Sequence, residues 1–108
     1  GFIHAGGDRW RLSPAFDINP SPSRHRVLET GIIQGGSFDA SLDIALEASE
    51  FFELTSADAE QHALHMANKI ANNWKLALRD AGASSDEIRS YAAAFEHAEA
   101  EAAQKLGD

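Results

Sequence analysis

The spacing of apolar residues along the chain changes near residue 40. After this point apolar side chains recur mostly every three or four positions, the period of helices that bury one face. Before it, short apolar stretches are separated by glycine, serine and proline, with three prolines between residues 14 and 22. The pattern predicts a mainly α fold in two parts: a β-hairpin and loop over residues 1–40, and a helical bundle over residues 41–108.

Two short segments near the N-terminus, Gly1 to His4 and Trp10 to Leu12, have the composition of β-strands. The stretch AGGD between them contains two glycines, which adopt the positive φ that tight hairpin turns require. We therefore expect an antiparallel hairpin here. Val27 to Ile33 are expected to add one further extended piece.

Helix boundary signals divide the second part into three helices. Ser41 can cap the first helix, and Thr55 can cap the second, which Gly82 ends. Ser84 and Glu87 have the spacing of a capping box for the third. With two short joints, these helices are expected to form a small antiparallel bundle.

The same periodicity predicts the core of the bundle. The stripe through Met66, Ile70 and Trp74 is expected to be its centre. Trp74 and Phe95 are expected to pack in the core, although a role as a platform for a ligand is an alternative. The third helix is expected to present an inner stripe made of Ile88, Tyr91, Ala92, Phe95, Ala102 and Leu106.

The net charge of −8 belongs entirely to the predicted bundle, where five Lys and Arg residues face thirteen Asp and Glu residues. An acidic surface repels phosphate backbones, so we expect no direct nucleic-acid binding by this part. No apolar run approaches the roughly 18 residues that a membrane span needs. The absence of cysteine excludes disulfides and thiolate metal sites and is typical of a cytoplasmic protein. A chain that begins with Gly1 rather than methionine is expected to be part of a longer protein.

Histidine and carboxylate residues on the predicted helices are weaker candidates for metal ligands. Asp58, His62 and His65 could share one helical face, but zinc needs a further ligand and no HExxH pattern is present. An exposed polar surface is the favoured interpretation. The same ordinary surface is expected of Glu96, His97 and Glu99. No GxSxG elbow marks a serine nucleophile.

Asp17 is the strongest candidate for chemistry. It lies between Phe16 and Ile18, directly after the predicted hairpin. In an extended stretch its neighbours point to the opposite side, so they could pack while Asp17 holds a divalent cation such as Mg²⁺. Alternatively, Asp17 is a turn residue before Asn19 and Pro20, which is the usual role of aspartate near proline.

The stretch GFIHAGGDRWRLSPAFDINP resembles the segment that follows the catalytic loop in HipA-type serine/threonine kinases. In that family a GF-[IL] start and a short hairpin lead into W-R-L-[ST]-P-[AF]-[FY]-D. The similarity continues through SFDASLDIALEASEFFELTSADA, NNWKLALRDAGASSDEI and AAAFEHA, and so covers nearly the whole chain. The SPAFD stretch is its specific part.

The resemblance implies that the chain is part of a kinase-like C-lobe in which Asp17 corresponds to the DFG aspartate, the ligand of the Mg²⁺ that bridges the ATP phosphates. It further implies ATP-dependent phosphorylation of a protein, with an aminoacyl-tRNA synthetase as substrate class, and a HipB-like antitoxin as partner. The family's ATP-covering loop, lysine, catalytic aspartate and second metal-binding asparagine would precede Gly1. The fragment alone is therefore expected to be inactive and to bind ATP weakly. The alternative is a non-catalytic, acidic helical module for protein interaction.

Overall fold

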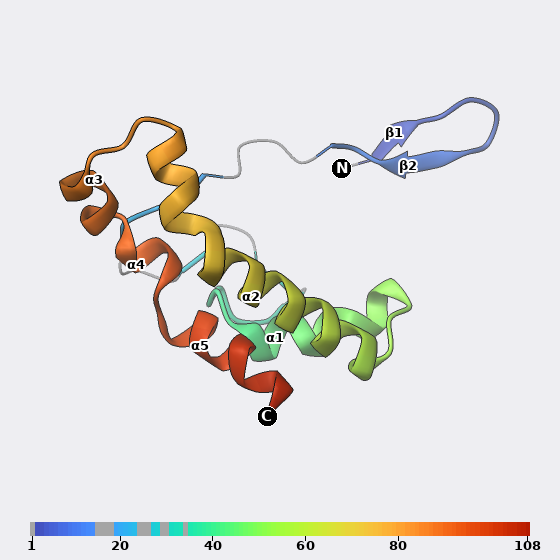
Figure 1. Cartoon of the computed structure of the whole chain (residues 1–108). Coiled ribbons are helices and arrows are strands. Elements are labelled where there is room, and N and C mark those ends of the chain that lie inside the picture. Colours follow the sequence, from blue (N-terminus) through green and yellow to red (C-terminus); the bar gives the residue numbers. More distant parts are fainter. Residues whose placement is uncertain (1, 15–18, 24–26, 29–30, 34) are drawn as a thin grey trace.

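The computed structural model describes residues 2–14, 19–23, 27–28, 31–33 and 35–108. A two-stranded antiparallel hairpin is followed by a helical body, which confirms the mainly α fold class (Figure 1). The elements in chain order are β1 (Phe2–His4), β2 (Trp10–Leu12), α1 (Leu42–Glu47), the 3₁₀ turn η1 (Ala48–Phe52), α2 (Ser56–Asp80), α3 (Ser85–Ser90), α4 (Ala92–Phe95), α5 (Ala98–Gln104) and the 3₁₀ turn η2 (Lys105–Gly107). No helix in the described ranges combines the length and the apolar character needed to cross a membrane.

The hairpin forms where the sequence predicts it. Phe2 pairs with Leu12 and His4 with Trp10, so these four side chains share one face of the sheet. The turn uses Gly6 and Gly7 at positive φ, as the sequence suggests. The His4 and Trp10 rings meet edge to face with centroids 5.0 Å apart. Apart from this contact the face is open, and Phe2, Trp10 and Leu12 are between 64% and 73% exposed.

In the loop between the hairpin and α1, the described part of the predicted extended piece forms a single isolated bridge. Val27 forms an isolated antiparallel bridge with Asp39, and the Leu28 N–H donates to the carbonyl oxygen of Phe38 at 2.6 Å. Neighbouring residues of this loop lie outside the described ranges.

Helix α2 is the axis of the body, and both of its ends form as predicted. The Thr55 hydroxyl accepts a hydrogen bond from the Asp58 N–H at 3.1 Å. At the other end Gly82 has a φ of 97°. Its N–H donates to Arg79, and the next N–H, that of Ala83, reaches back to Leu78. These two bonds form a Schellman motif, in which glycine avoids the strain that a Cβ atom would meet.

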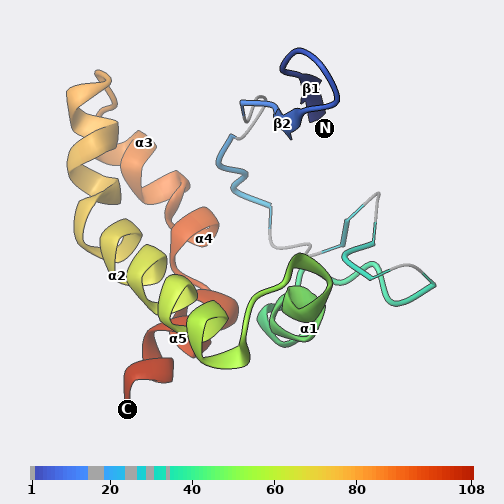
Figure 2. The ribbon, with the colours of Figure 1, turned by 90° about the vertical axis from the view of Figure 1, so that its right-hand side faces the viewer.

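The predicted third helix is divided into α3, α4 and α5, which run back along α2 (Figures 1 and 2). The main break is at Glu96 and His97, whose backbones are extended. Because the chain restarts there, the helical register shifts. Ala102, expected on the inner stripe, is exposed, and its neighbour Ala103 is buried instead. Ile88 is buried as predicted.

The core is small and lies around Trp74, which is 5% exposed and stacks on Phe95 with ring centroids 4.7 Å apart. The core prediction is correct for Trp74 but wrong for Met66 and Ile70, which are 58% and 49% exposed. These two side chains line an open groove instead of being buried under another helix. The apolar stripe of α2 is therefore only partly buried.

The molecule is extended for its length. Its radius of gyration is 16.1 Å, whereas a compact chain of this size would have about 13 Å. In two perpendicular views the hairpin stands apart from the helices (Figures 1 and 2). Two strands alone are marginally stable in water, so the open apolar face of the hairpin is a surface suited to further packing.

We expect Trp74→Ala to lower the free energy of unfolding by about 3–5 kcal/mol, because the substitution removes a buried indole and with it the ring on which Phe95 stacks. Urea denaturation followed by circular dichroism measures this loss. Leu76→Ala is the matched control on the same helix, where the side chain is exposed and the expected change is about 0.5 kcal/mol or less. Equal losses in the two variants would contradict the assignment of Trp74 to the core.

A second prediction concerns the capping box of α3, in which the Ser84 N–H donates to Glu87 and the Glu87 N–H donates to Ser84 Oγ, both at 3.2 Å. The bond from the Ser84 backbone N–H, followed by that from its side chain, lowers the pKa of Glu87 below its ordinary value of 4.5. A lowered folded-state pKa means that the charged carboxylate stabilises α3 above the unfolded-state pKa. This contribution disappears as the pH falls through the folded-state pKa.

Titration of the Glu87 side chain by NMR should therefore give a midpoint below 4.5. In Ser84→Ala the midpoint should rise because the hydroxyl is gone, while the backbone donor remains. An unchanged midpoint in this variant would show that the hydroxyl does not contribute.

Candidate functional site

Asp17, the metal ligand expected from the sequence, lies outside the described residues together with Phe16 and Ile18. The structure describes the residues on either side of this stretch. Pro14 is exposed after β2, and Asn19 and Pro20 border a groove on the helical body. The prediction for Asp17 therefore stays a prediction.

The weaker metal candidate is an exposed stretch of α2. Asp58, His62 and His65 are all exposed, and the Asp58 backbone serves the N-cap of the helix. Within the described ranges, no group of three histidine, cysteine or acidic side chains has a geometry that could hold a metal ion. The expectation of an exposed surface is correct for these three residues.

The expectation of an ordinary polar surface fits Glu96 but not His97 and Glu99. Glu96 is exposed and lies 3.6 Å from the Lys75 ammonium. His97 is half-buried, and its Nδ1 accepts a hydrogen bond from the Ala100 N–H at 3.2 Å, which caps α5. Glu99 is half-buried as well, and its Oε2 accepts from the Leu42 N–H at 2.7 Å. This bond joins the start of α1 to α5 across 57 positions of sequence.

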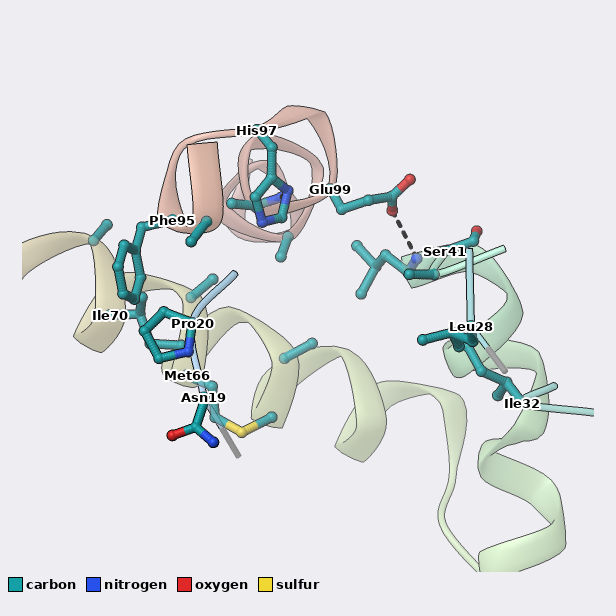
Figure 3. A pocket seen from close by; sticks show the side chains of 18 residues that line it. Asn19, Pro20, Leu28, Ile32, Ser41, Met66, Ile70, Phe95, His97 and Glu99 are labelled. Carbon is teal, nitrogen blue, oxygen red and sulfur yellow. Dashed lines mark hydrogen bonds between the residues drawn. The ribbon is translucent and has the colours of Figure 1, made fainter. Parts of the chain in front are cut away.

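The described part of the chain forms an open groove of about 720 Å³, which we call the α2–α5 groove. It lies between α2, the chain from α4 to α5, the start of α1 and parts of the preceding loop (Figure 3). Its described lining is mostly aliphatic and aromatic, and its volume is within the range of small-molecule sites. Residues representative of its different walls are Pro20, Leu28, Met66, Ile70, Phe95 and Glu99.

Both ends of the groove contain polar as well as apolar side chains, with Asn19 near Pro20 at one end and Leu28 and Ile32 near Ser41 at the other. Figure 3 shows Phe95, Ile70 and Pro20 toward one end, and Ser41 and Glu99 toward the other. The Phe95 wall is held from behind by the Trp74 indole, with the two rings 14° from parallel. The end that contains Ser41 is held by the bond from the Leu42 N–H to Glu99, and both of these residues belong to the lining.

No pattern in the sequence predicts this groove, because the groove depends on the break in the predicted third helix. A continuous third helix would have packed on the stripe that contains Met66 and Ile70. The part of the lining that the structure describes offers hydrophobic contact, a hydroxyl, an imidazole, a carboxamide and one carboxylate. Such a surface can bind and orient a molecule.

Comparison with protein-family models, with curated proteins and with solved structures finds no match to this chain.

Proposed function

We propose that this chain is the C-terminal part of the C-lobe of a HipA-like protein serine/threonine kinase, to which it contributes Asp17 as a Mg²⁺ ligand. The observation that carries the proposal is the stretch WRLSPAFD, in which the aspartate follows a hairpin strand and a proline. The described hairpin, which ends at Leu12 just before this stretch, supports the proposal. So does the predominantly helical remainder.

The open face of the hairpin agrees with a place inside a larger protein. Phe2, Trp10 and Leu12 form an apolar surface that no described element of this chain covers. In a kinase this surface would pack against the part of the lobe that carries the catalytic loop. That packing would hold the chain after β2 at the nucleotide site.

A single aspartate is a fitting contribution to a magnesium site. Mg²⁺ usually takes one or two carboxylates and completes its shell with water and substrate phosphates. When bound with ATP, the ion offsets the negative charge on the phosphoryl group during transfer. In this proposal Asp17 positions the ion, and the hairpin and the helical body position Asp17. The remaining catalytic groups would belong to other parts of the longer protein.

The same proposal includes the cofactors, compartment, partner and substrate of the longer protein. Its cofactors would be ATP and Mg²⁺, its compartment the cytoplasm, and its partner a HipB-like antitoxin. Its substrate would be a protein such as an aminoacyl-tRNA synthetase. These roles follow from the resemblance of the Asp17 segment and depend on it.

A second candidate function is that of a non-catalytic, acidic module for interaction. The observation that favours it is the α2–α5 groove, an open apolar surface in the part of the chain that carries the whole net charge of −8. In this case Asp17 would be a turn residue before Asn19 and Pro20. The sequence that encodes the residues before Gly1 separates the two functions, because only the kinase requires a D-x-H-x-x-N loop there.

We expect Asp17→Asn, made in the longer protein, to leave the melting temperature nearly unchanged, since asparagine suits turns and extended chain as well as aspartate does. Phosphoryl transfer should fall by about 100-fold or more, because the metal stabilises charge that develops in the transition state. Autophosphorylation and thermal melting of the same preparation measure both effects.

Asp8→Asn is the matched control. It also removes one carboxylate near the hairpin, but from the exposed turn between β1 and β2. Its phosphoryl transfer should equal that of the unmodified protein. A folded Asp17→Asn protein with normal transfer would rule out the metal role, and equal losses in both variants would indicate a general effect of charge.

A further inference from the structure

The size of the α2–α5 groove results from small side chains on the two helices that face each other across it. Ala63, Ala67 and Ala71 follow one another at intervals of four on α2, and Ala100 and Ala103 belong to α5. Residues four apart lie on the same face of a helix, so the alanines of α2 form one continuous wall. Larger residues at these positions would fill the space, whose volume of about 720 Å³ is within the range of small-molecule sites.

The groove also has a defined long direction. Phe95, stacked on the buried Trp74, makes a flat aromatic wall at one end. Toward the other end Glu99 brings a carboxylate and Ser41 a hydroxyl to the lining (Figure 3). Asn19 and His97 are the further polar residues of the described lining. A ligand that matches this arrangement has an apolar body and one polar end.

The sign of the charge on that polar end follows from the electrostatics of the site. Glu99 contributes a carboxylate, of which one oxygen accepts from the Leu42 N–H, and a carboxylate can accept further hydrogen bonds. No lysine or arginine occurs among the described residues that line the groove. The helical part as a whole carries the entire net charge of −8. A cationic group is therefore favoured there, and a carboxylate or phosphate is disfavoured.

We propose that the α2–α5 groove binds a small apolar molecule that carries one cationic group, such as an arylalkyl amine. The apolar body lies along the alanines toward Phe95, and the ammonium group lies next to Glu99. This proposal is independent of the kinase assignment, because it depends neither on Asp17 nor on a metal ion.

Three probes of nearly equal shape test it: 4-phenylbutylammonium, 4-phenylbutan-1-ol and 4-phenylbutyrate. Each is titrated into the 108-residue chain and followed by two-dimensional NMR of the backbone amides. We expect saturable shifts at Ala67, Ala71 and Ala103. The ammonium should bind at least about tenfold more tightly than the carboxylate, with the alcohol between them.

Two variants locate the site. Ala67→Leu should abolish saturable binding of all three probes because the larger side chain fills the groove. Ala77→Leu, an exposed position of α2 outside the described lining, should bind as the unmodified chain does. Glu99→Gln keeps an oxygen that can accept from the Leu42 N–H but removes the charge. It should therefore retain binding of the alcohol while most of the advantage of the ammonium is lost.

Circular dichroism on each variant separates loss of the site from loss of the fold. The proposal is overturned if no probe gives saturable shifts in the folded chain, or if the carboxylate binds as tightly as the ammonium. It is also overturned if a folded Ala67→Leu variant binds like Ala77→Leu. None of these outcomes depends on Asp17, so the kinase proposal can fail while this one holds, and the reverse.

Discussion

The stack between Trp74 and Phe95 is the contact on which the arrangement of the helical part depends. Trp74 lies near the last third of α2, and Phe95 ends α4, so the contact fixes where the returning chain meets the central helix. Among the described residues, the other buried apolar ones are Ile88 and three alanines, which contribute much less area than an indole. With so few large buried side chains, the position of α3 to α5 on α2 depends mainly on this one aromatic pair.

The break in the helical chain comes directly after Phe95 and determines the surface of the helical body. Glu96 and His97 adopt extended conformations, and the His97 ring replaces the missing helical partner of the Ala100 N–H. Helix α5 therefore leaves the direction of α4 and crosses the N-terminal half of α2. The space left beside Met66 and Ile70 becomes the groove, and the bond from Leu42 to Glu99 brings α1 to its rim. The exposure of Met66 and Ile70 and the partial burial of Glu99 thus both result from the break between α4 and α5.

Local features of the fold were predictable from the sequence, because each depends on a few neighbouring residues. The hairpin turn needs Gly6 and Gly7, the end of α2 needs Gly82, and Thr55 and Ser84 supply caps within three positions of their partners. The break in the third helix was not predictable in this way. The stretch from Ile88 to Leu106 has good helical periodicity throughout, and tertiary contacts override it.

The candidate sites differ in the same respect. Glu99 accepts a hydrogen bond from Leu42, which lies 57 positions away in the sequence. No spacing between neighbouring residues predicts this contact, and the expectation of an ordinary surface role for Glu99 was wrong. Asp17 is the opposite case. Its interest comes from a local motif of hairpin, proline and apolar neighbours, and the prediction for it depends on residues that the structure does not describe.

The division of charge along the chain connects the two proposals. A complex of Mg²⁺ with ATP remains an anion, and the helical part with its net charge of −8 repels it. The first forty residues are neutral, because four arginines balance four acidic residues, so a nucleotide site that includes Asp17 would lie on the side of the chain where this repulsion is weakest. A cationic ligand has the opposite preference and is drawn to the helical side, where Glu99 lies in an apolar groove that strengthens its attraction. The chain therefore separates, by charge alone, the region suited to a phosphate-bearing ligand from the region suited to an amine.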